Sequence, residues 1–196
     1  MKLTTITLLA AAMAAAPAIA EDEHRELGPH VHGHGTLNMA IEKSRISMEL
    51  EVPGMDIVGF EHTALSKEQK AAVDNANKLL SDPLSLFKVP AAAGCKVADA
   101  KVAIEPEHEH GDDDHDEKAG EEHGDHDHEG HEGHNEFHVT YALDCTKPAA
   151  LTSMQFDYFK SFSGAHDLSV NVVTATAQSK YEVSRDKPTL DLGGMM

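Results

Sequence analysis

The sequence predicts an α+β fold with a mainly antiparallel sheet, one principal helix and a long disordered hairpin loop rich in His and acidic residues. About seven segments alternate apolar and polar residues, which is the pattern of strands with one buried face. Only one segment combines a clear helical cap with helical spacing. No repeat of a solenoid or propeller type is present, so we expect a single domain.

The chain opens with a predicted secretory signal peptide, residues 1–20. Lys2 gives a short positive region, residues 3–16 are almost uniformly apolar or small, and Ala18-Ile19-Ala20 matches an A-x-A cleavage site. The apolar run is too short to span a bilayer. We therefore expect an exported domain over residues 21–196 with no membrane insertion.

A hairpin and a helix are predicted next. Residues 37–42 and 46–52 alternate as strands, with a short polar turn between them, and Pro53-Gly54 ends the second strand. Ser66 and Gln69 form a capping box for a helix that runs to about Leu80. One side of this helix is predicted to pack on the sheet: Gln69, Ala72, Val73, Ala76, Leu79 and Leu80.

The second half of the chain supplies the remaining strands. Residues 97–104 and 137–145 flank the His-rich insertion, so we expect an antiparallel pair joined by an overgrown hairpin loop. Further strands are expected at 154–158, 168–174, 181–183 and 190–192.

Cys95 and Cys145 bracket the insertion. Exported proteins usually pair their cysteines, and a disulfide here would hold the ends of a self-repelling loop together. The alternative is two free thiols that join a metal site.

The insertion, residues 105–138 (the His-rich segment), is predicted to be disordered. It holds 15 acidic residues against a single Lys118, and accounts for −14 of the chain's formal charge of −18. Such a charge disfavours nucleic acid and anionic membranes as partners. The segment contains nine of the fifteen histidines: His108, His110, His115, His123, His126, His128, His131, His134 and His138.

Interleaved imidazoles and carboxylates are good ligands for divalent first-row metals. The variable spacing and the interspersed glycines favour several labile sites over one rigid centre. Two other interpretations are a pH-sensing tract and a solvated acidic linker. The Irving–Williams order leaves copper or nickel buffering as an alternative to zinc.

A second, more ordered candidate lies near the mature N-terminus. His30, His32 and His34 recur at alternate positions, and would share one face if the chain were extended there. His62, with Glu61 beside it, is a possible further ligand. The alternative is a flexible histidine-containing tail.

Three segments and the cysteine pair around a His-rich loop resemble the ZrgA family of bacterial periplasmic zinc-uptake proteins. The segments are His30-Val31-His32-Gly33-His34-Gly35, the stretch from Val52-Pro53-Gly54 to Glu61-His62, and Leu84-Ser85-Leu86-Phe87. The resemblance implies a periplasmic location, zinc binding and support of zinc import under scarcity.

We therefore expect a non-catalytic protein that captures Zn(II) and supports uptake through a zinc ABC importer or its binding protein. No Walker loop or H-E-x-x-H helix argues for catalysis. The alternative from another class is a zinc-dependent hydrolase that uses His30, His32, His34 or His62, which would need an open coordination position and a general base.

Overall fold

The computed structural model describes residues 31–106 and 134–195, and confirms the predicted α+β class. The predicted signal peptide and residues 107–133 of the His-rich segment lie outside the described residues. The strands are β1 His34–Glu42, β2 Arg45–Pro53, β3 Phe87–Lys88, β4 Cys95–Pro106, β5 Asn135–Cys145, β6 Ser153–Phe156, β7 Asp167–Thr174, β8 Gln178–Ser184 and β9 Thr189–Asp191. The helices are α1 Gly54–Val58, α2 Lys67–Leu80, α3 Pro83–Leu86 and α4 Tyr158–Ser161, with short 3-10 turns at Ala91–Ala93 and Pro148–Ala150.

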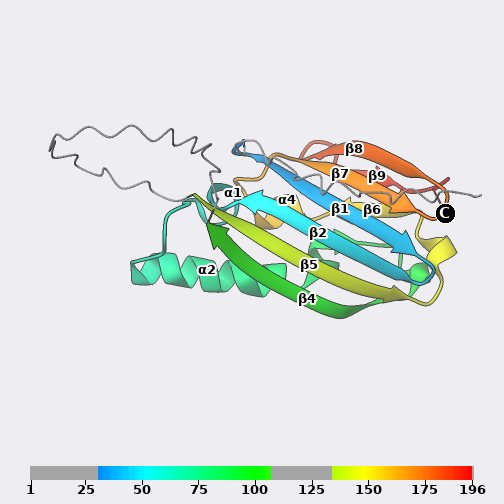
Figure 1. The fold of residues 1–196 in the computed structure, drawn as a ribbon, viewed down its shortest axis with the longest axis horizontal. Helices are drawn as coiled ribbons and strands as arrows, with labels where there is room; N and C mark the ends of the chain where they lie inside the picture. Colours follow the sequence, from blue (N-terminus) through cyan, green and yellow to red (C-terminus); the bar gives the residue numbers. More distant parts are fainter. Residues whose placement is uncertain (1–30, 107–133, 196) are drawn as a thin grey trace, which may run out of the picture.

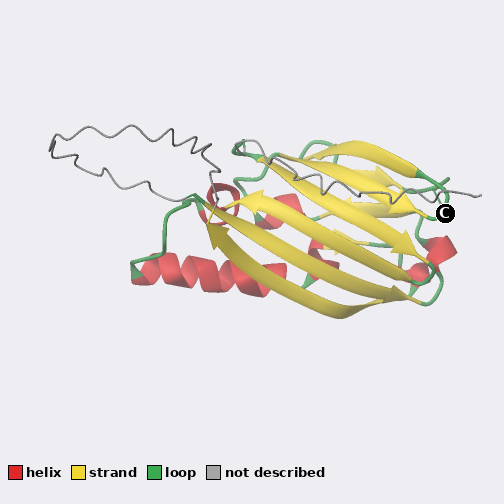
Figure 2. Ribbon diagram, viewed as in Figure 1, coloured by secondary structure: helices red, strands yellow, loops and turns green. Residues whose placement is uncertain are grey.

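Six strands form the large sheet, in the order β4-β5-β2-β1-β7-β8, and three form a small sheet, β3-β6-β9 (Figure 1). Neighbouring strands of both sheets are antiparallel except β1 and β7, which run parallel. The small sheet and α4 lie behind the large sheet in the view of Figure 2. The large sheet therefore has an inner face toward these elements and an outer face on the opposite side.

The core fills the space between the two sheets. Alternate residues of the large-sheet strands are buried there, such as Leu37 and Leu50, which are register partners. Phe87 of β3 connects the layers, because its ring lies 6.0 Å from Tyr141 of β5 and 5.5 Å from Phe156 of β6. Since side chains alternate along each strand, burial of one set places the intervening polar residues on the outer face.

The predicted helix is confirmed. Ser66 Oγ accepts the Gln69 backbone N–H at 3.0 Å, and Gln69 Oε1 accepts the Ser66 N–H at 3.0 Å, which completes the capping box. One expected strand boundary was wrong, because Tyr158 begins α4 and does not extend β6. Tyr158 and the next residue, Phe159, are both buried. A strand with one buried face cannot bury two successive side chains, whereas a helical turn can.

Strands β4 and β5 form the predicted antiparallel pair at the base of the His-rich segment. Their pairing extends from Cys95 opposite Cys145, which form the predicted disulfide, to Pro106 opposite Asn135. The ends of the segment differ from the prediction, because Glu105 lies in β4 and His138 in β5. In the described parts of the chain, no helix is long and apolar enough to cross a membrane.

Candidate metal centre

Two neighbouring strand pairings bring a histidine and two carboxylates together on the outer face. Parallel pairing makes Asp167 of β7 the register partner of His34 of β1. Antiparallel pairing places Glu182 of β8 opposite Ser169 of β7, two residues from Asp167. The core face of these strands carries Leu37, Leu168 and Val170, so His34, Asp167 and Glu182 lie on the other face by alternation.

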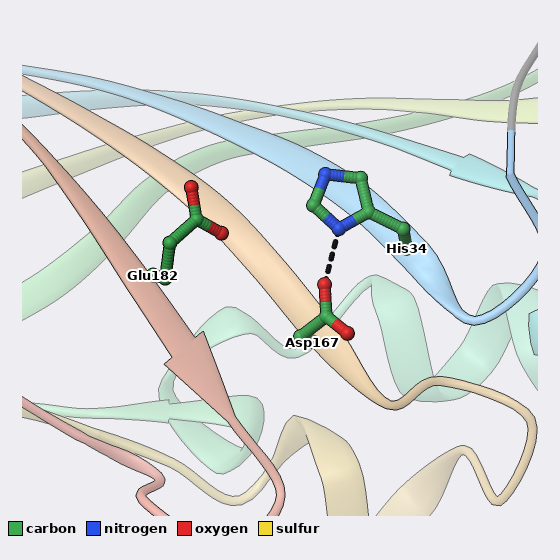
Figure 3. A group of neighbouring side chains, drawn as sticks. All are labelled: His34, Asp167 and Glu182. Atoms are coloured by element: carbon green, nitrogen blue, oxygen red, sulfur yellow. Dashed lines mark hydrogen bonds and ion pairs between the residues drawn. The ribbon is translucent and has the colours of Figure 1, made fainter.

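His34, Asp167 and Glu182 form a group that could hold a metal ion, called here the sheet site (Figure 3). One ligand atom from each residue lies within 4.8 Å of the other two. His34 Nδ1 already contacts Asp167 Oδ1. The side chains of His34 and Asp167 are 39 % and 42 % exposed, so an ion could reach the site from solvent. Imidazole with carboxylate oxygens is a ligand set that Zn(II) accepts.

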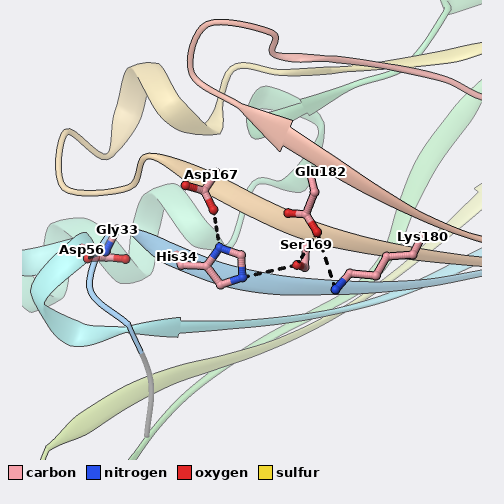
Figure 4. A network of polar contacts seen from close by, with 7 residues as sticks. All are labelled: Gly33, His34, Asp56, Asp167, Ser169, Lys180 and Glu182. Atoms are coloured by element: carbon pink, nitrogen blue, oxygen red, sulfur yellow. Dashed lines mark hydrogen bonds and ion pairs between the residues drawn. The ribbon is translucent and has the colours of Figure 1, made fainter. Parts of the chain in front are cut away.

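A polar network orients the sheet site (Figure 4). Ser169 is buried; its hydroxyl donates to Glu182 Oε1 at 2.9 Å and lies 3.3 Å from His34 Nε2. Lys180 Nζ lies 3.5 Å from the same Glu182 oxygen. Hydrogen bonds of this kind fix the rotamers of metal ligands. Lys180 is a competing cation that a bound metal would displace from Glu182.

The chain turns just before β1, which separates His32 from His34. The His34 N–H donates to the Val31 carbonyl at 3.0 Å, and Gly33 has a φ of 87°. Glycine tolerates this left-handed conformation, and a Cβ at Gly33 would lie 2.9 Å from the His166 ring. His32 and His34 therefore do not share the face that an extended segment would have given them. His30 lies outside the described residues.

His32 instead contacts Glu61, and so does His134 of the His-rich segment. His32 Nε2 lies 2.8 Å from Glu61 Oε1, and His134 Nδ1 lies 2.5 Å from Glu61 Oε2. The Glu61 side chain is only 8 % exposed, whereas those of His32 and His134 are 53 % and 52 % exposed. Three segments that are distant in the sequence thus meet around one buried carboxylate.

A second buried carboxylate, Asp56 of α1, lies close to this cluster. Its Oδ1 accepts the Gly33 N–H at 2.7 Å (Figure 4), while its buried Oδ2 has no hydrogen-bond partner in the described part of the chain. Burial is the main cause that raises the Asp56 pKa, and repulsion from Glu61 adds to it. The hydrogen bond from Gly33 and the nearby histidines act in the opposite direction.

His62 and His138 make other contacts. The Nδ1 atom of His62 lies 3.0 Å from the Thr63 carbonyl oxygen, and its Nε2 atom lies 3.3 Å from Gln69 Nε2. The His62 ring therefore contacts the first turn of α2. His138 Nε2 lies 3.1 Å from Glu136 Oε2, and this contact is the main cause that raises the His138 pKa. Metal binding by these two residues stays a prediction.

The other histidines predicted as ligands lie outside the described residues: His108, His110, His115, His123, His126, His128 and His131. Conversely, Asp167 and Glu182 were missed from the sequence. Their strands were predicted, but only the parallel pairing of β1 with β7 brings them to His34. The alternation of apolar and polar residues predicts each strand, but it does not indicate which strands lie next to each other.

Comparison with protein families agrees with a metal-handling role. The sequence model of one family, described as ZrgA family zinc uptake protein, matches residues 29–192, which is most of the chain. The match includes both carboxylates of the sheet site and the whole His-rich segment. A comparison with curated proteins found no match. The chain belongs to the ZrgA family of zinc uptake proteins.

Proposed function

We propose that this protein is a periplasmic, non-catalytic zinc-binding protein that captures Zn(II) and supports its uptake through an importer. The single observation that carries the proposal is the sheet site, where His34, Asp167 and Glu182 converge on the outer face of a chain of the zinc uptake family. Its partial exposure favours exchange with solvent over permanent storage. The disulfide between Cys95 and Cys145 supports an oxidising compartment.

In this proposal the His-rich segment is a labile reservoir. Its histidines and acids concentrate divalent ions beside the folded domain, and bound cations offset a charge of −14. Because protons compete with metal for imidazole, its capacity falls as pH decreases.

Two measurements test the proposal. Native mass spectrometry with added zinc is applied to the mature chain and to a variant in which a short Gly-Ser linker replaces residues 107–133, so that β4 and β5 can still pair. Loss of several zinc ions on deletion of the segment, with at least one ion retained, is expected.

The second measurement is growth under zinc chelation. Cells that lack the whole gene should grow poorly, and the wild-type gene should restore their growth, whereas the gene carrying His34→Gln should not. Equal growth of the deletion mutant and the wild type would refute a role in uptake.

A further inference from the structure

We propose that His32, Glu61 and His134 form a second zinc site, the neck site, at the junction of the His-rich segment and the folded domain. The inference deepens the proposed function, because it names the place where an ion leaving the segment first meets the domain. His134 belongs to the segment, whereas His32 lies two residues before the sheet-site ligand His34.

Backbone contacts hold the three ligands in place. The Asn135 N–H donates to the Glu61 carbonyl at 2.8 Å, which fixes His134 next to Glu61. The Gly33 N–H donates to Asp56 at 2.7 Å, which holds the turn that carries His32. Asp56 is itself closely packed, because a Cβ at Gly164 would lie 2.7 Å from its Cα. The meeting of these residues therefore follows from the fold and does not depend on side-chain contacts alone.

Charge and burial favour a cation at this position. Glu61 and Asp56 are 7 % and 3 % exposed, and His32 lies near both of them. Burying two carboxylates is costly unless positive charge compensates them. A divalent ion bound between the histidines and Glu61 would supply this compensation.

Binding zinc requires the two imidazoles to turn toward one ion. Zinc ligands at 2.0–2.1 Å in tetrahedral arrangement are about 3.3 Å from one another. The contacts of 2.8 and 2.5 Å join His32 and His134 to separate oxygens of Glu61, and the three residues do not converge as closely as those of the sheet site. Both imidazoles are about half exposed, so they have room to turn and replace these contacts by bonds to a shared ion. Two His and one Glu leave a fourth position open, which permits rapid exchange.

Anomalous diffraction at the zinc edge, from zinc-loaded crystals of the mature chain, tests the site directly. The expected result is a peak about 2.0–2.1 Å from His32 Nε2, His134 Nδ1 and a Glu61 oxygen. A zinc peak at the sheet site but none at the neck site, with the contacts of Glu61 to both histidines intact, would overturn the neck site and leave the proposed function standing. Absence of zinc from both sites would refute the proposed function as well.

A solution experiment separates a metal site from a purely structural cluster. Imidazole ¹⁵N shifts of the mature chain are followed during zinc titration, for wild type, Glu61→Gln and the charge-matched control Glu42→Gln. Glu42 is exposed at the far end of β1. We expect Glu61→Gln to weaken the zinc response of His32 and His134 by at least about 10-fold, while that of His34 is retained. Unchanged responses of His32 and His134 in Glu61→Gln would contradict the proposal.

Discussion

His34 of β1 and Asp167 of β7 are register partners in the only parallel strand pair that the described residues form, and their side chains meet on the outer face of the sheet. The two residues are 133 positions apart in the sequence. Parallel partners of this kind point to the same face, so the imidazole and the carboxylate converge because of strand pairing and need no long loop. The sheet therefore fixes the backbone positions from which both side chains reach the site.

Asp167→Asn should weaken zinc binding at the sheet site by about 10- to 100-fold, because an amide is a poorer and uncharged ligand. Calorimetry in competition with a chelator measures the change, and the His34 imidazole shift assigns it to this site. Glu49→Gln is the control, since Glu49 is an exposed acid of β2 on the same face. An equal loss in both variants would indicate a general effect of charge.

The strands and the main helix could be predicted because their signals are local. The alternation in β1, β2 and β5 and the capping box of α2 each lie within a few consecutive residues. The disulfide was also predictable, because a chain that is expected to be exported and has only two cysteines offers one intramolecular pairing.

The two candidate metal sites were less predictable because they depend on contacts between distant segments. The alternation of His30, His32 and His34 suggested one shared face, but Gly33 turns the chain and sends His32 to Glu61 and His34 to Asp167. Short helices such as α1 and α3 were missed as well, since a single helical turn has too few residues to show periodicity.

Removal of the disulfide by Cys95→Ala with Cys145→Ala should lower the free energy of unfolding by about 4 kcal/mol, the chain-entropy cost of a loop of about 50 residues. Urea unfolding of the metal-free proteins measures this loss. Zinc affinity at the sheet site should stay unchanged, because β4 lies at the opposite edge of the large sheet from β8. A loss below about 1 kcal/mol would show that strand pairing alone holds the base of the His-rich segment.

Arg185 holds the segment that leads into β7. Its guanidinium donates to the carbonyls of Phe159, Phe162, Ser163 and Ala165. Arg185→Lys should cost about 1–3 kcal/mol in unfolding free energy, because an ammonium cannot reproduce the planar fork of donors. Arg45→Lys is the control, since Arg45 makes an exposed ion pair with Asp144 and exposed pairs contribute little to stability. Comparable losses in both variants would contradict this role.

The raised pKa of buried Asp56 predicts a pH dependence of stability. Because the folded-state pKa lies above the unfolded value, the folded state binds the proton more tightly, and stability falls as pH rises from about 4 through the folded-state pKa. The amide side chain of Asp56→Asn cannot ionise, and its oxygen can still accept the Gly33 N–H. The loss of stability that comes from ionising a buried carboxyl should therefore be absent from this variant. Urea unfolding with a chelator present, between pH 4 and 8, should show the wild type losing stability relative to Asp56→Asn as pH rises. A constant difference between the two proteins would mean that Asp56 titrates alike in the folded and unfolded states.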